Sequence, residues 1–281
     1  MKDPKILFEK TAFECSKLIT HRYSTSFTIG IQTLDKTYQA PIYAIYGFVR
    51  YADEIVDTFH DQDKQRLLND FRTATFSAIN QQISLNPVLH AFQITVNRYK
   101  IENELIDAFL TSMEMDLNFK NYNAANYEEY IHGSAEAVGL MCLRVFCNGN
   151  QEAYDRLKYS ACKLGAAFQK VNFLRDLKSD FEDRGRTYFP GIDFDGFNDV
   201  VKKEIEKDIE RDFQEALIGI NQLPKGAYLG VKIAYVYYLK LFHKIRSMSS
   251  QSVIGKRIRI PNARKIALLT QTYFRTKMGL T

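Results

Sequence analysis

The amino-acid sequence predicts one all-α domain that covers residues 1–281. Apolar residues recur with the helical period along most of the chain, and no convincing alternating strand interrupts them. The 6 prolines and 14 glycines are few for this length, whereas an all-β fold needs many turns. No internal repeat or linker divides the chain, which is long enough to bury a substantial core.

The helical period places ten predicted helices along the chain. Two of them begin at proline-containing pairs, Asn86-Pro87 and Pro261-Asn262, because proline suits the first turn of a helix. The clearest loops are expected at 184–196 and 247–262. The predicted helices cover residues 5–20, 37–60, 64–82, 87–98, 102–118, 126–147, 151–182, 199–221, 227–248 and 262–277.

Composition and cysteine usage favour a cytoplasmic globular protein. Hydrophobic residues make up 46% of the chain and charged residues 25%. The N-terminus lacks an apolar signal core, and no uncharged apolar stretch approaches the roughly 20 residues that span a bilayer. No cysteine pair has C-x-x-C or zinc-site spacing, so we expect reduced thiols. The four cysteines are Cys15, Cys142, Cys147 and Cys162.

Charge is distributed unevenly along the chain. Residues 216–281 contain 12 Lys and Arg and no acidic residue, whereas residues 1–215 contain 26 basic and 33 acidic residues. This asymmetry indicates an anionic ligand near the last quarter of the chain, such as a phosphate, a nucleic acid or a lipid surface. A basic surface that is merely solvated is the simpler interpretation.

The stretch "YADEIVDTF" (51–59) places acidic residues after an almost uncharged run. Helical spacing puts Asp53 and Asp57 on one polar stripe with Tyr46 and Arg50. Like charges four residues apart repel each other unless a cation lies between them. One such pair is weak evidence, because exposed acidic pairs are common on solvated helix faces.

A second stripe repeats this arrangement more than a hundred residues later. Gln169, Asn172, Asp176 and Asp180 share one face of a helix that is otherwise largely apolar. A buried amide without a partner costs about 1–3 kcal/mol, so these side chains need a ligand or a neighbour. Two facing stripes would gather four carboxylates, which suit Mg²⁺ together with a substrate phosphate.

At these residues the chain resembles the squalene/phytoene synthase family of head-to-head prenyltransferases. The resemblance spans nearly the whole chain, and a chance match is improbable. The segments that carry it are "HRYSTSF" (21–27), "YGFVRYADEIVD" (46–57), "YIHGSAEAVGLM" (130–141), "QKVNFLRDLKSDFEDRGRTYFP" (169–190) and "RIRIPNARK" (257–265).

The resemblance implies an isoprenoid-synthase-type helical bundle around a deep central cavity. It implies Mg²⁺, with Mn²⁺ as an alternative, bound by Asp53, Asp57, Asp176 and Asp180 with help from Asn172. It implies that the substrate diphosphate is bound by Ser24, Arg50, Tyr238, Arg257 and Lys265. The cavity residues near the reacting carbons would be Tyr46, Tyr130 and Gln169. Arg175 and Arg186 lie in the matching motif.

The implied chemistry explains these residue types. Cations stabilise a departing diphosphate, so that an allylic carbocation forms. The double bond of a second prenyl chain attacks this cation, and proton loss closes a cyclopropylcarbinyl diphosphate, which then rearranges to the linear product. The cavity must exclude water, and aromatic faces ease positive charge. The proton acceptor is Tyr130 or the released diphosphate, although a hydroxyl tied down in packing is nearly as good an interpretation of Tyr130.

The sequence departs from the family pattern at two acidic positions. Glu54 replaces the second Asp of the commoner D-D-x-x-D motif, but it points away from the face of Asp53 and Asp57. Glu136 stands where relatives usually carry a small residue, so close helix packing there needs it to face solvent or to pair with Arg. We interpret His132 as a helix-face residue without a catalytic role.

The predicted activity is condensation of two geranylgeranyl diphosphates to phytoene in carotenoid biosynthesis, without NADPH. A C15 relative that makes dehydrosqualene, squalene or a hydroxylated product is the alternative, because cavity depth sets chain length. A carboxylate-bridged di-metal bundle is disfavoured because no Glu-x-x-His occurs, and a non-catalytic subunit would be expected to lose aspartates. A nucleic-acid binder is also disfavoured. Peripheral contact with a bilayer is expected because the product is oily.

Overall fold

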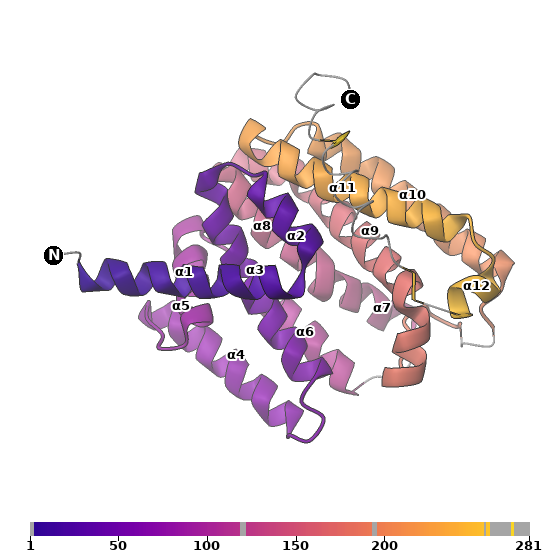
Figure 1. The fold of residues 1–281 in the computed structure, drawn as a ribbon, viewed down its shortest axis with the longest axis horizontal. Helices are drawn as coiled ribbons and strands as arrows, with labels where there is room; N and C mark the ends of the chain where they lie inside the picture. The colour runs from indigo at the N-terminus through magenta and orange to yellow at the C-terminus, as the bar shows by residue number, and fades with distance from the viewer. Residues whose placement is uncertain (1–2, 119–121, 193–195, 256, 259–270, 273–281) are drawn as a thin grey trace.

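The computed structural model describes residues 3–118, 122–192, 196–255, 257–258 and 271–272, and it confirms the all-α class (Figure 1). The elements in chain order are α1 (Pro4–Tyr23), α2 (Thr25–Gln32), α3 (Lys36–Asp57), α4 (Lys64–Gln81), α5 (Pro87–Tyr99), α6 (Asn103–Asn118), α7 (Ala124–Ile131), the π-helix η1 (His132–Glu136), α8 (Ala137–Cys147), α9 (Gln151–Arg184), α10 (Asp199–Ile220), α11 (Lys225–Arg246) and α12 (Ser250–Gly255). The predicted helix 262–277 falls almost wholly outside the described residues.

Two short helices were not predicted from the periodicity. The start of α2 is set by Ser24, whose hydroxyl accepts a hydrogen bond from the backbone N–H of Phe27 at 3.2 Å. The expectation of a loop over 247–262 is wrong for α12. Tertiary contacts hold this short helix: Val253 is fully buried, and the Ser250 N–H donates to Asp199 at 2.7 Å.

The predicted continuous helix 126–147 is interrupted by η1, which separates α7 from α8. Neighbouring backbones approach η1 on two sides. A Cβ atom at Gly133 would lie 2.3 Å from the carbonyl oxygen of Ala108 on α6, and one at Gly165 on α9 would lie 2.6 Å from the carbonyl oxygen of Ala135. This close packing requires glycine at both positions. Helical periodicity in the sequence does not reveal such contacts, so it did not predict the π-helix.

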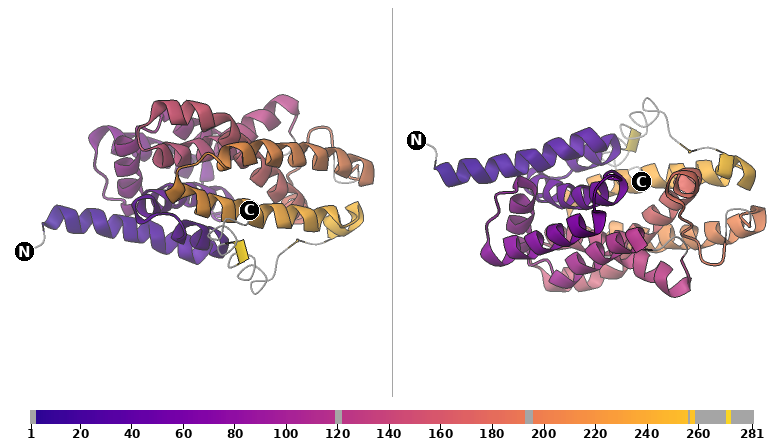
Figure 2. Two further views of the ribbon diagram at one scale, coloured as in Figure 1. Left: turned by 90° about the horizontal axis from the view of Figure 1, so that it is seen from above. Right: turned by 90° about the horizontal axis from the view of Figure 1, so that it is seen from below.

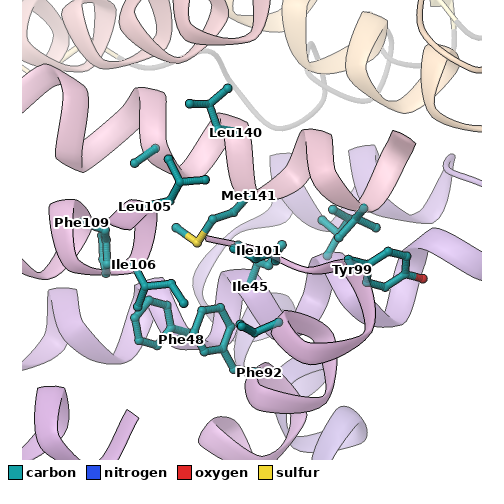
Figure 3. Close-up of a cluster of buried hydrophobic side chains, with 14 of the residues drawn as sticks. Ile45, Phe48, Phe92, Tyr99, Ile101, Leu105, Ile106, Phe109, Leu140 and Met141 are labelled. Atoms are coloured by element: carbon teal, nitrogen blue, oxygen red, sulfur yellow. The ribbon is translucent and has the colours of Figure 1, made fainter. Parts of the chain in front are cut away.

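An apolar core lies between α3, α5, α6 and α8 (Figure 3). The rings of Phe48 and Phe92 stack with centroids 3.9 Å apart and an interplanar angle of 4°. Phe109 packs against Phe48, and Ile45 and Met141 are buried in the same cluster. This core fixes α3, and therefore the position of the acidic stripe at its C-terminal end.

The longest helix, α9, extends over 34 residues and is held to α10 by a buried charge network. Lys170 of α9 hydrogen bonds to Asp208 and Asp212 of α10, and Lys163 lies 3.3 Å from Asp212. The Asp212 side chain is fully buried. Because a buried carboxylate without a partner is strongly destabilising, these lysines fix the register of α9 against α10.

The views in Figures 1 and 2 show how the helices surround α9. It crosses the middle of the molecule, with α10 and α11 along one side and α3, α6 and α8 along the other. The N-terminal end of α1 projects past its neighbours. Within the described ranges, none of the helices combines the length and apolarity needed to cross a bilayer.

Replacing Gly133 by Ala is expected to lower the free energy of unfolding by about 1–3 kcal/mol, because the new methyl group overpacks the contact with Ala108. Gly255→Ala is the matched control, since no heavy atom lies within 4 Å of its Cβ position. Urea unfolding of both variants measures the difference. Equal stability of the two would contradict the role of close packing at η1.

Candidate active site

A cavity of about 1020 Å³ runs through the bundle between α2, α3, α6, α7, η1, α8, α9, α10 and α11. Along α9 the lining residues recur every three or four positions from Leu157 to Asp180, a helical distance of about 34 Å. Carboxylates line one end of the cavity, and apolar side chains line the remainder. The apolar portion includes Ile31, Leu34, Ile45, Val138, Cys142, Leu143, Phe146, Leu164 and Ile220.

The first acidic stripe lies where α3 reaches this end of the cavity. Asp53 and Asp57 both line it, as predicted, whereas Glu54 is absent from the lining and accepts a hydrogen bond from Thr58 at 2.7 Å. Arg50 lies 3.5 Å from Asp53. Burial, opposed by Arg50 and reinforced by neighbouring carboxylates, raises the pKa of Asp53 to about 7.

The second acidic stripe enters the same end of the cavity from α9. Asn172, Asp176 and Asp180 all line it, and the orientation of Asp176 is fixed by two arginines. Nε of Arg257 lies 2.7 Å from Asp176 Oδ1, and Nε of Arg175 donates to the same carboxylate at 3.0 Å. The two acidic stripes therefore share one cavity, as the sequence predicted.

The five predicted metal ligands line one cavity, but their side chains are not close enough together to coordinate a metal ion as they stand. Among the described residues, no group of three or more Asp, Glu, His or Cys side chains is close enough to hold a metal ion. Their donor chemistry nevertheless fits Mg²⁺. All of the donors are oxygens, and Oδ1 of Asn172 is buried without a hydrogen-bond partner among the described residues.

Four of the five predicted diphosphate-binding residues also line the cavity. They are Ser24, Arg50, Tyr238 and Arg257, whereas Lys265 lies outside the described residues. Nε of Arg50 is buried and has no hydrogen-bond partner in the described part of the chain. Thr25 and Ser26 add hydroxyls at the N-terminus of α2, where the helix dipole favours anions.

The three residues predicted near the reacting carbons all line the cavity: Tyr46, Tyr130 and Gln169. Tyr46 packs against the ring of Phe27, with centroids 5.7 Å apart. The Gln169 carbonyl oxygen accepts a hydrogen bond from the amide of Asn172 at 3.4 Å. Tyr130 is buried, and its hydroxyl donates to Asp116 at 2.8 Å.

Sequence reasoning missed Asp116, the residue that organises this polar end. Its side chain is 7% exposed, and Tyr122, Tyr130 and Tyr188 all donate hydrogen bonds to it. Arg186, which also lies 3.4 Å from Asp57, is 3.5 Å from the Asp116 carboxylate. A signal was present in the sequence, because Asp116 continues the stripe of Phe109 and Met113 on α6, and all three line the cavity.

The remaining sequence predictions concern His132, Glu136 and the cysteines. Glu136 pairs with His132 at 3.1 Å rather than with an arginine, and this contact raises the pKa of His132. His132 is half exposed and is absent from the cavity lining. All four cysteines are free, and burial raises the pKa of Cys142 to about 12.

The chain belongs to the squalene/phytoene synthase family, whose family model, described as "Squalene/phytoene synthase", matches residues 20–264. This match covers both acidic stripes, η1 and the cavity-lining helices. The family resemblance predicted from the sequence is thereby confirmed.

The relatives that this chain resembles include a diapophytoene synthase and phytoene synthases. The chain is 26% identical to the 4,4'-diapophytoene synthase of Staphylococcus haemolyticus, over 66% of this chain and 65% of that protein. It is 30% identical to the phytoene synthase of Arthrospira platensis, over 66% of this chain and 63% of that protein. Both alignments thus span just under two thirds of the relative.

The fold agrees with solved structures of the same type. A dehydrosqualene synthase crystallised with a ligand superposes with a TM-score of 0.83 and 22% identity, and the match covers 98% of this chain and 100% of that chain. At this identity the likeness concerns the fold alone. It confirms the isoprenoid-synthase-type helical bundle.

The raised pKa of Asp53 predicts pH-dependent stability. Because the Asp53 carboxyl group binds its proton more tightly in the folded state than in the unfolded chain, the free energy of unfolding falls as the pH rises from about 4 to about 7. In EDTA, the free energy of unfolding of Asp53→Asn relative to the wild type is expected to be about 1 kcal/mol higher at pH 8 than at pH 5. This magnitude is reduced because the Asp53 side chain is partly accessible to solvent.

Urea unfolding at the two pH values measures this effect. Asp61→Asn, which removes an exposed aspartate shortly after α3, controls for net charge and is expected to show no such difference. A stabilisation of Asp53→Asn that is the same at both pH values would contradict the burial of an acidic group at this position.

Proposed function

We propose that the protein condenses two geranylgeranyl diphosphates head to head, through a cyclopropylcarbinyl diphosphate, to phytoene. The observation that carries this proposal is a single long cavity with carboxylates and arginines at one end and apolar side chains along the rest. Such a shape matches two substrates that each have an anionic head and a long hydrocarbon tail.

The polar end supplies the groups that binding and release of diphosphate require. Arg50 and Arg257 offer guanidinium groups, which suit phosphate geometry, and Ser24 lies at the N-terminus of α2. Mg²⁺ held by Asp53, Asp57, Asn172, Asp176 and Asp180 would neutralise charge that develops on the leaving diphosphate. The arginines that now pair with these aspartates would then contact the phosphate oxygens.

The apolar part of the cavity protects the cationic species. Ile45, Val138 and Leu164 offer no nucleophile, and the surrounding helices exclude water that would quench a carbocation. Phe168 and Tyr238 stack at a centroid distance of 3.9 Å, and both line the cavity, where aromatic rings would stabilise a nearby cation. Tyr130, at the boundary of the two regions, is the proposed proton acceptor.

Condensation of two farnesyl diphosphates to dehydrosqualene, squalene or a hydroxylated product is the second candidate. The S. haemolyticus relative favours it. The phytoene synthases of A. platensis and Synechocystis, the latter 25% identical over 95% of this chain and 86% of that protein, favour the C20 substrate. The cavity extends to Phe146 and Leu157, and we retain the longer substrate as the first candidate.

Two further expectations belong to this proposal. Phytoene formation is redox-neutral, so the reaction is proposed to proceed without NADPH. Because the hydrocarbon product partitions into lipid, peripheral contact with a bilayer is proposed for its release.

Incubation with C15 or C20 diphosphate and Mg²⁺, without NADPH, tests the substrate. The C20 substrate is expected to give a C40 hydrocarbon, identified by product mass. A C30 product alone would overturn the phytoene assignment and support the second candidate. Absence of coupled product from both substrates would refute the head-to-head reaction itself.

Asp53→Asn and Asp176→Asn are each expected to lower Mg²⁺-dependent turnover by more than about 10²-fold, because the diphosphate loses charge stabilisation when a ligand is removed. The far-ultraviolet circular dichroism should stay helical. Glu182→Gln is the matched control, since Glu182 is an exposed residue of the same helix as Asp176 and pairs with Lys178. Unchanged turnover in either aspartate variant would contradict the assignment of that aspartate as a metal ligand.

A further inference from the structure

Asp116 is the point at which three tyrosine hydroxyls and one guanidinium meet at the polar end of the cavity. The hydrogen-bond distances to Tyr130, Tyr188 and Tyr122 are 2.8, 3.0 and 3.2 Å. A carboxylate that accepts this many bonds in a buried position is held in one orientation. The predicted role of Tyr130 as a proton acceptor therefore depends on whether Asp116 can accept the Tyr130 hydroxyl proton.

The two oxygens of Asp116 are unequally occupied. Oδ1 accepts hydrogen bonds from Tyr122 and Tyr188 and lies 3.5 Å from Arg186. Within the described part of the chain, Oδ2 accepts a hydrogen bond from Tyr130 and from no other side chain. Because a carboxylate oxygen has two lone pairs, Oδ2 keeps capacity for a proton, and the shortest hydrogen bond in the cluster leads to it.

The three tyrosines also differ in their access to substrate. Tyr122 is absent from the cavity lining, whereas Tyr130 and Tyr188 belong to it. The Tyr188 oxygen already accepts a hydrogen bond from Arg186 at 3.4 Å. Among the described residues, Tyr130 is therefore the cavity-lining tyrosine of this cluster whose oxygen accepts no hydrogen bond, so this oxygen can take a proton from substrate.

Ring packing fixes the Tyr130 oxygen in place. Its ring lies 5.1 Å from the ring of Tyr122, 5.1 Å from that of Tyr188 and 5.9 Å from that of Phe173. Phe173 in turn stacks on Tyr188 with centroids 4.1 Å apart. These contacts leave the phenol little rotational freedom, so Asp116 and the aromatic cluster together decide where its lone pairs point.

We propose that Asp116 positions Tyr130 and receives its hydroxyl proton when Tyr130 accepts a proton from the cationic intermediate. The step balances as follows. A C–H bond of the carbocation breaks, and its electron pair closes the cyclopropane ring. The released proton joins the Tyr130 oxygen, while the original hydroxyl proton moves to Asp116 Oδ2, so Tyr130 ends neutral and the carboxylate becomes a carboxylic acid.

The surroundings of Asp116 suit a carboxylate that gains and later returns a proton. Burial raises the pKa of Asp116, which favours acceptance of a proton, and the Arg186 guanidinium opposes this rise. A proton delivered to a neutral phenol alone would leave a positive charge on an oxygen in an apolar cavity. With Asp116 as the onward acceptor, the transfer removes a charge pair from the cavity instead.

This inference rests on the proposed function, and Asp116→Asn tests it. The amide keeps the shape and can still accept a hydrogen bond from Tyr130, but it cannot take the proton. Formation of the coupled product is expected to fall about 10²-fold. Ionisation should continue, so the share of substrate released as prenyl alcohol should rise. Deuterium at C1 of the substrate should slow coupling more in this variant than in the wild type.

Tyr130→Phe and the variant that combines it with Asp116→Asn complete a double-mutant cycle. Tyr130→Phe is expected to show the same rise in prenyl alcohol, and the double variant no further loss, because both residues act in one transfer. If Asp116→Asn fails to fold, the product ratio of Tyr130→Phe decides alone, and a wild-type ratio there overturns the inference.

Tyr159→Phe is the matched control, since it also removes a tyrosine hydroxyl that donates to a carboxylate, that of Glu215 at 2.8 Å, but Tyr159 is exposed and lies outside the cavity lining. Its product ratio should equal that of the wild type. A merely structural Asp116 would lower coupled product and alcohol together at an unchanged ratio, which would overturn the inference. Wild-type protein without any coupled product would instead refute the proposed function, and the inference would fall with it.

Discussion

The structure depends on balancing several carboxylates at one end of an apolar cavity. Asp53, Asp57, Asp116 and Asp176 each lie near a guanidinium group: the partners are Arg50, Arg186 for both Asp57 and Asp116, and Arg175 with Arg257. Without these contacts, carboxylates at this depth would be forced to take up protons or to leave the cavity. The same guanidinium groups are well suited to bind phosphate, so charge balance in the resting protein and substrate binding use the same side chains.

Holding these charges in place requires a rigid frame. The stacked Phe48 and Phe92 rings fix α3, and the Lys170 contacts with Asp208 and Asp212 fix α9. The acidic stripes come from these two helices, which enter the cavity with defined registers. Preorganised charges cost little rearrangement when a leaving group departs, which is why a packed helical bundle is an effective support for such chemistry.

Periodicity predicted most of the helices and both acidic stripes, because i, i+3 and i+4 spacing reports directly on a helix face. It failed where contacts between distant segments decide the outcome. Ala108 approaches Gly133 closely at η1, which interrupts an otherwise helical pattern, and Asp199 contacts α12 in a segment that was predicted to be a loop. Asp116 escaped notice because its place on the stripe of Phe109 and Met113 reveals nothing of the three tyrosines that surround it: Tyr130 lies on α7, and Tyr122 and Tyr188 lie in segments between helices.

The five residues of η1 also constrain how this chain can evolve. Tyr130, Ser134, Val138 and Cys142 line the cavity at intervals of four residues, although an α-helix turns every 3.6 residues and would let such a row drift around its axis. A wider π-helical turn absorbs part of that drift. Deleting one residue here would rotate α8 by about 100° relative to α7, whereas exchanging side chains would not. Insertions and deletions at this point are therefore excluded more strictly than substitutions.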